Sequence, residues 1–98
     1  MTTPILSIHA SKQIATRHIT TEEEVLQAVA RHSARIQRSR APEVKVIVRT
    51  FRTRIVLNDG SNGDVVLACV DPQTLVVKTV MLQRSSQVER KRQYETYL

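Results

Sequence analysis

The sequence predicts an α+β domain in which two N-terminal helices pack on a three- to four-stranded antiparallel sheet, with a C-terminal helix as a further candidate element. Three observations lead to this class. Helical periodicity ends before Pro42, and β-branched alternation begins directly after it. Short turns separate the apolar runs of the second half, which favours antiparallel pairing. Helices that precede the strands, rather than alternate with them, favour α+β over a parallel α/β sheet.

The N-terminal segment carries the helical signals. The stretch ASKQIATRH can form two helical turns with Ala10 and Ile14 inward and Ala15 as a further inward candidate. A second, stronger helix is expected from about Thr21 to Gln37. Thr20 or Thr21 is its expected N-cap, because a glutamate follows three residues later at the spacing of a capping box. The glutamates of its first turn also lie where the helix dipole favours negative charge.

The second half of the chain has the pattern of strands joined by turns. β-branched residues with period-two alternation are typical of strands, and Asp-Gly, Asn-Gly and proline clusters are typical of turns. Residues 43–57 are expected to form one bent strand, or two strands with a corner near 49–53. A hairpin loop at 58–64 then leads to a buried strand at 64–70. A turn at 71–74, a central strand at 75–83 and a helix or mobile tail at 85–98 follow. A single domain is therefore expected over residues 1–84, followed by the charged segment 85–98.

The charge balance indicates a polyanionic partner. The chain has 15 Lys and Arg against 9 Asp and Glu, a formal net charge of +6. On so small a domain this favours nucleic acid, with RNA expected first and DNA second. Cys69 is the only cysteine, so a disulfide framework is excluded and a reducing, cytoplasmic location is expected. No stretch approaches the ~20 apolar residues of a membrane span.

The residue inventory argues against several kinds of site. Gly60 and Gly63 are the only glycines, so the chain has no glycine-rich phosphate loop. One cysteine and three scattered histidines do not give the spacing of a zinc site, and neither a metal nor a cofactor is expected. Cys69 lies in an apolar run, where it is expected to pack as a small buried hydrophobe. What remains is a set of basic and polar side chains.

The spacing of those side chains places some of them together. His9 and Arg17 are eight residues apart, a little over two turns, and so share nearly one side of the first helix. Arg52 and Arg54 are two apart in a strand and point to one face. The residues expected to contact nucleic acid are Lys12, Arg49, Arg52 and Lys78. For each residue taken singly, a solvated surface charge is the alternative interpretation.

These residue types suit the cleavage of RNA without a metal. In that reaction a base removes the 2′-OH proton, cations stabilise the crowded phosphate, and an acid protonates the leaving oxygen. Histidine can exchange a proton near neutral pH, and arginine binds phosphate through a bidentate fork. The expected roles are His9 as acid or base, Arg17 and Arg54 on the phosphate, and Thr79 orienting it.

A resemblance to a known family supports the same residues. The stretch HASKQIATRHITTEEEVLQAV is similar to the opening of a widespread family of small bacterial and phage proteins, and VVKTVML resembles the family's last strand. That family is grouped with the barnase/EndoU/colicin/RelE-like (BECR) ribonuclease toxins. The resemblance implies a BECR-like domain with candidate site residues His9, Arg17, Thr79 and either Arg52 or Arg54. One departure is His18, where the family usually has glycine.

Three functions remain as hypotheses. The first is a metal-independent endoribonuclease of toxin type. The second is a non-catalytic module of the same fold, for instance a phage or mobile-element inhibitor of a host protein or nucleic-acid machine, with an antitoxin, immunity or host protein as a further partner. The third is an assembly protein or homodimer whose C-terminal helix contacts its partner through Val88, Tyr94 and Tyr97.

Overall fold

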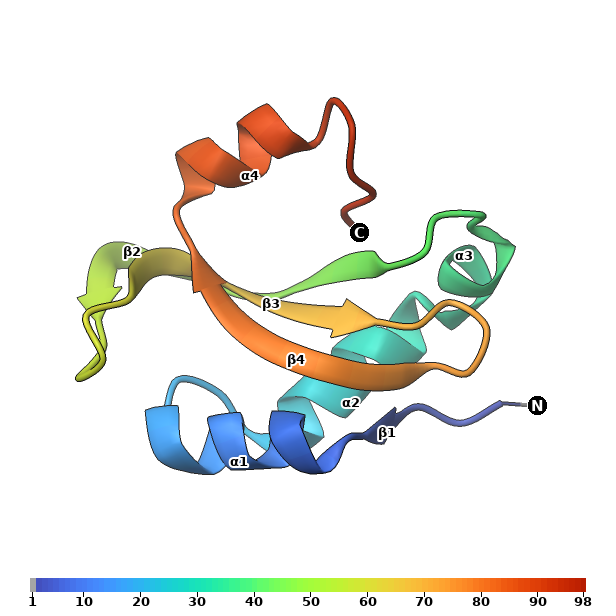
Figure 1. Ribbon diagram of the computed structural model, residues 1–98, viewed down its shortest axis with the longest axis horizontal. Helices are drawn as coiled ribbons and strands as arrows, with labels where there is room; N and C mark the ends of the chain where they lie inside the picture. Colours follow the sequence, from blue (N-terminus) through green and yellow to red (C-terminus); the bar gives the residue numbers. More distant parts are fainter. Residues whose placement is uncertain (1) are drawn as a thin grey trace.

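A computed structural model of the protein describes residues 2–98, and its sheet has the strand order β1-β4-β3-β2 (Figure 1). The α+β class predicted from the sequence is confirmed. The helices are α1 (Ile8–Arg17), α2 (Glu22–Arg31), α3 (Ser33–Arg38) and α4 (Ser85–Lys91), and the strands are β1 (Ile5–Leu6), β2 (Val44–Val56), β3 (Asn62–Val70) and β4 (Val76–Gln83).

Three helices, rather than two, lie before the long strands. The helix expected from Thr21 to Gln37 begins as predicted, because the Thr21 side chain accepts a hydrogen bond from the Glu24 N–H as an N-cap. It is interrupted at His32, whose backbone leaves the helical region and whose N–H bonds back to Val29 at 3.2 Å. Apolar residues keep helical spacing across this break, so periodicity alone does not reveal it.

The sheet is mixed rather than wholly antiparallel. β2, β3 and β4 pair antiparallel, as predicted for consecutive strands with short turns. β1 adds a parallel edge to β4, with Ile5 opposite Val76 and Leu6 opposite Val77. A strand of two residues is too short to show the alternation by which strands are recognised in a sequence, and this explains why β1 was not expected.

β2 is one bent strand, the first of the two alternatives drawn from its sequence. Its register against β3 moves from Thr50 opposite Val65 to Ile55 opposite Gly63, so residues 51–54 bulge out opposite the single residue Asp64. Such a bulge bends a strand and increases its twist. The bend carries the end of β2 and its hairpin away from the rest of the sheet, at the left of Figure 1.

Helices cover both faces of the sheet. α1 and α2 lie on one face, over a core that includes Val46, Val66 and Val80, and α4 lies on the other (Figure 1). On the second face Val88 of α4 packs with Val65 and Leu67 of β3. Burial of these aliphatic side chains is the main source of stability in a chain with few aromatic residues. Cys69 of β3 is buried, as predicted.

The segment after α4 returns to the sheet and covers part of its β2 edge. The Leu98 N–H donates to Lys45 O at 2.8 Å, and the Ile47 N–H donates to Leu98 O at 2.7 Å, next to a parallel bridge between Lys45 and Tyr97. The Tyr97 hydroxyl lies within hydrogen-bonding distance of Gln83 and, at 3.0 Å, of a Glu95 carboxylate oxygen. The part of β2 beyond Ile47 extends past this segment.

Candidate functional site

The polar side of α1 completes the hydrogen bonding of the β4 edge. Gln13 Oε1 accepts a hydrogen bond from the Val80 N–H at 2.8 Å, and an Arg17 Nη atom donates to Val80 O at 3.3 Å. At the N-cap of α1, the Ser7 hydroxyl donates to Lys78 O at 3.0 Å. Side chains of a helix thus take the place of a neighbouring strand beyond β1, and this fixes the end of α1 against the sheet.

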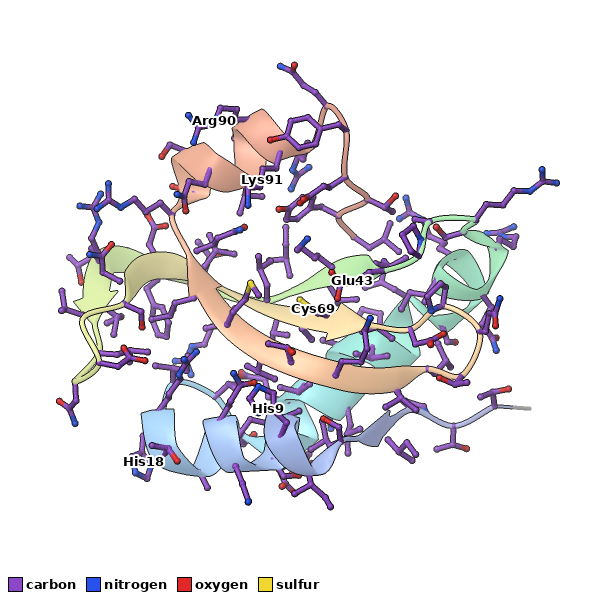
Figure 2. All side chains as sticks on the ribbon, in the orientation of Figure 1. His9, His18, Glu43, Cys69, Arg90 and Lys91 are labelled. Carbon is purple, nitrogen blue, oxygen red and sulfur yellow. The ribbon has the colours of Figure 1, made fainter. Side chains whose placement is uncertain are left out.

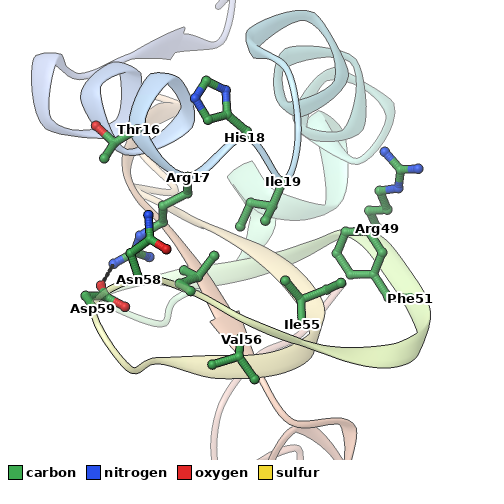
Figure 3. A pocket seen from close by; sticks show the side chains of 11 residues that line it. Thr16, Arg17, His18, Ile19, Arg49, Phe51, Ile55, Val56, Asn58 and Asp59 are labelled. Carbon is green, nitrogen blue, oxygen red and sulfur yellow. Dashed lines mark hydrogen bonds and ion pairs between the residues drawn. The ribbon is translucent and has the colours of Figure 1, made fainter.

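A groove of about 530 Å³ lies between the end of α1 and the β2–β3 hairpin (Figure 3). Arg17 stands at one end of it and Arg49 at the other. Between them, the apolar side chains of Ile19 and Ile55 form part of its floor, and Phe51 lies beneath Arg49. The site therefore combines two cations with an apolar surface that is open to solvent.

Arg17 is held in place by two contacts. Besides Val80 O, its guanidinium lies 3.3 Å from Asp59 Oδ2 in the hairpin turn, and the two side chains are 22% and 54% exposed. The Asp59 carboxylate is itself anchored by Ser61, whose N–H and hydroxyl both donate to Oδ1. These Ser61 hydrogen bonds, and then the Arg17 charge, hold the pKa of Asp59 below its ordinary value.

Arg49 has a more open environment. Its side chain is 52% exposed, and its one acidic neighbour within residues 2–98 is Glu24, with an oxygen 4.0 Å away. The guanidinium carbon lies 5.2 Å from the centroid of the Phe51 ring, a cation–π arrangement. The ring supports the guanidinium from one side, and its outward donors stay available to an anion.

The bulge of β2 carries two more arginines, between the groove-lining residues Phe51 and Ile55. Arg52 and Arg54 are exposed, and neither forms an ion pair within residues 2–98. From Val44 to Asn58 every charged residue is a cation. The nearest carboxylate along the chain beyond the turn is Asp64, whose two oxygens accept hydrogen bonds from Ser85 at the start of α4.

The predicted catalytic residues are distributed over several parts of the fold. Only Arg17 lines the groove. His9 is exposed on the side of α1 that carries Gln13 and Arg17, next to β4 in Figure 2. Thr79 pairs with Cys69 on the face of the sheet opposite α1, and Arg54 lies on the projecting hairpin. His9 and Arg17 thus share one side, whereas Thr79 faces the other way.

The other predicted contact residues have varied surroundings. Of the nucleic-acid set, Arg49 lines the groove, whereas Arg52 is exposed in the β2 bulge and does not line it. Lys12 is exposed on α1, and the Lys78 ammonium pairs with Glu43 at 3.3 Å. Of the partner-contact set, Val88 is 3% exposed and packs within the chain, Tyr97 is half-buried, and Tyr94 is 70% exposed.

Sequence reasoning did not identify three features of the groove. Phe51 and Ile55 were expected only as strand residues, and Asp59 only as a turn residue. Their meeting with Arg17 depends on the bulge of β2, which has no simple sequence signature. An Arg-x-Phe pair two apart in a strand would have been a usable signal, because such residues share a face.

His18 ends α1 in the left-handed region. Its φ of 55° and ψ of 30° are those of a helix C-cap that usually carries glycine or asparagine. Its backbone borders the groove, but Figure 3 shows the imidazole on the far side of the loop from the hairpin. The residue therefore shapes the turn, and its ring does not point at the arginines.

No three His, Cys, Asp or Glu side chains gather as a metal site in residues 2–98. Over the same residues, no helix has both the length and the apolar character needed to span a bilayer. Comparison of the chain with protein-family models, curated proteins and solved structures finds no match. The functional argument therefore depends on the groove and the residues around it.

Proposed function

We propose that the protein binds nucleic acid, RNA above all, through the β2–β3 hairpin and the groove at its base. The observation that carries the proposal is the weak pairing of the hairpin arginines. Arg52 and Arg54 form no ion pair within residues 2–98, although the Arg54 charge helps to lower the pKa of Asp64, and Arg49 has one carboxylate oxygen at 4.0 Å. Phosphate groups are the anions that such exposed guanidinium groups bind best. A run of them along one strand suits a polyanion better than a single small ligand.

Two cations elsewhere on the sheet are paired with carboxylates. Lys45 lies 3.0 Å from a Glu95 oxygen, and Lys78 lies 3.3 Å from Glu43. A second group of exposed arginines, 31, 35 and 38, lies on α2 and α3. That group sits on helices and lines no part of the groove, whereas Arg49 lines the groove and Arg52 and Arg54 lie on the same strand. A site that binds bases as well as phosphates needs cations next to an apolar surface. This requirement favours the hairpin.

The test uses fluorescence anisotropy to measure the affinity of the protein for a single-stranded RNA of about 20 nucleotides, at one moderate salt concentration. The triple variant Arg49→Ala, Arg52→Ala, Arg54→Ala is expected to bind at least about tenfold more weakly than the wild type. The matched control is Arg31→Ala, Arg35→Ala, Arg38→Ala, which removes the same charge from the helices and should bind as the wild type does. A loss confined to this control, or a wild type that binds no RNA, contradicts the proposal.

A metal-independent endoribonuclease of toxin type is the second candidate. The observation in its favour is His9, whose exposed side chain has no hydrogen bond or ion pair within residues 2–98 and lies on the α1 side that carries Arg17. The resemblance to BECR ribonuclease toxins supports the same residue. In this reaction His9 would exchange the proton while arginines hold the phosphate.

Cleavage is tested separately from binding. Purified protein is incubated with RNA in the presence of EDTA, and the products are resolved on a gel. The enzyme hypothesis predicts that the wild type cleaves the RNA and that His9→Ala does not. His32→Ala, which replaces a histidine outside the groove, should cleave as the wild type does. A wild type that binds RNA without cleaving it leaves the binding function standing and ends the enzyme hypothesis.

A further inference from the structure

The floor of the groove is apolar, and phosphates alone do not account for it. Ile19, Phe51 and Ile55 contribute to a surface that lies between the two arginines in Figure 3. A ligand that consisted only of phosphate and sugar would leave this surface in contact with polar groups. A ligand with a flat apolar part between charged groups would cover it and gain the free energy of apolar burial.

The volume of the groove suits one nucleotide. At about 530 Å³ it falls within the range of roughly 300–1,000 Å³ that is typical of small-molecule sites. In a duplex the bases are paired and stacked inward, out of reach of a concave protein surface. In a single strand a base can turn out of the stack and enter such a site.

The pair of Arg49 and Phe51 provides a stacking surface. The guanidinium plane and the aromatic ring, with 5.2 Å between guanidinium carbon and ring centroid, present flat groups at one end of the groove. Bases stack on aromatic rings and on arginine planes alike. Arg49 also keeps outward donors for a phosphate, because its nearest carboxylate oxygen, from Glu24, is 4.0 Å away.

We propose that the groove holds one unpaired base of a single-stranded nucleic acid, with the base against Phe51 and Ile55 and the neighbouring phosphate on Arg49. The proposal rests on the proposed nucleic-acid function and adds a class of substrate to it. Charge and shape together select this occupant: Arg49 at one end of the groove is open to a phosphate, Arg17 at the other end is paired with Asp59, and the surface between them is apolar. Duplex nucleic acid would meet only the exposed arginines of the hairpin.

The experiment compares three probes of equal length and equal phosphate number: a single-stranded RNA, the same backbone with abasic residues throughout, and a duplex. The wild type is expected to bind the RNA about tenfold more tightly than the abasic strand. Arg49→Lys keeps the charge and removes the flat guanidinium, so the ratio of its affinities for the RNA and the abasic strand should fall towards one. Phe51→Leu is a second variant that keeps the apolar volume and removes the ring.

The outcomes separate the two proposals. Equal affinity of the wild type for RNA and the abasic strand overturns the base-binding inference and leaves electrostatic binding of nucleic acid intact. An absence of binding to any probe overturns both. The site itself is tested by methyl NMR: the Ile19 and Ile55 signals should shift on addition of RNA, whereas the signal of Ile36, which is buried far from the groove, should not. Shifts confined to other methyl groups also contradict the assignment.

Discussion

Gln13 of α1 accepts a hydrogen bond from the backbone N–H of Val80 in β4 at 2.8 Å, so a helix side chain satisfies a group at the edge of the sheet. Unpaired edge groups are a route to aggregation, and proteins usually cover them with short strands, charges or a helix. Here Arg17 binds the oxygen of the same Val80 residue. The end of α1, and with it one wall of the groove, is positioned by these two contacts.

Loss of the Gln13 contact should therefore destabilise the fold. Gln13→Leu leaves the Val80 N–H without its acceptor, and the expected loss in free energy of unfolding is about 1–3 kcal/mol. Gln13→Glu keeps an oxygen at the same position and should lose much less. Urea denaturation of the two variants makes the comparison; equal losses would mean that packing, rather than the hydrogen bond, is what Gln13 contributes.

Gly63 is required by the close approach of β3 to β4. A Cβ at this position would lie 2.6 Å from the backbone oxygen of Gln83. Gly63→Ala should therefore lower the free energy of unfolding by about 2–3 kcal/mol, since neither strand can move freely. Gly60→Ala is the control: its φ of 84° is strained for alanine, but nothing lies within 4 Å, and the expected loss is about 1 kcal/mol. The reverse order of the two losses would contradict this account.

The Cys69 thiol should be unreactive in the folded protein. Burial, and next the charge of Glu43, raises the pKa of Cys69 to about 11. At pH 8 a maleimide reagent should therefore label Cys69 only as fast as the protein unfolds. The pKa of this thiol is higher in the folded than in the unfolded protein, so the folded state favours the protonated thiol. Its contribution to the free energy of unfolding is therefore complete below pH 9 and is lost as the pH rises from 9 to 11.

The pH effect is isolated by comparison with Cys69→Ala. Other groups also titrate between pH 9 and 11, so the relevant quantity is the difference between the two proteins in their loss of stability over this range. The wild type should lose more than the variant. Rapid labelling of the native protein at pH 8, or an identical pH dependence in Cys69→Ala, would show that the thiol is accessible.

Asp59 should compete with nucleic acid for Arg17. It is a carboxylate in a groove otherwise bordered by cations and neutral side chains, and its exposed ion pair with Arg17 is of a kind that contributes little to stability. Asp59→Asn is expected to tighten RNA binding about threefold. Asp71→Asn, in the β3–β4 turn where Asp71 accepts a hydrogen bond from the Gln73 N–H, changes the net charge equally and should have a smaller effect. An equal gain in RNA affinity in both variants would mean that net charge alone, and not the position of Asp59, causes the effect.

The sequence was sufficient for features that depend on local pattern. The Thr21 cap, the inward positions of Ala10 and Ile14, and the burial of Cys69 follow from spacing and composition, and the structure confirms each of them. Ala15, the further inward candidate, is exposed. The hairpin arginines were identified because strand residues two apart share a face. Local pattern carries this information because capping, amphipathicity and alternation act over a few residues.

The groove was not predictable in the same way. Phe51 and Arg17 line one groove because β2 bulges opposite Asp64 and because Asp59 in the turn reaches the end of α1. The parallel edge strand β1 was also missed, since its two residues pair with β4 far along the chain. Such features depend on long-range packing, which a single sequence does not encode in any short segment.

The salt dependence of RNA binding tests the central claim most directly. Each arginine that neutralises a phosphate of a single strand contributes about 0.7 to the slope of log affinity against log salt concentration. Replacement of Arg49, Arg52 and Arg54 by alanine should therefore reduce that slope by about 2, and replacement of Arg31, Arg35 and Arg38 should leave it unchanged. Equal slopes in the wild type and the hairpin variant would contradict the claim that the hairpin is the nucleic-acid interface.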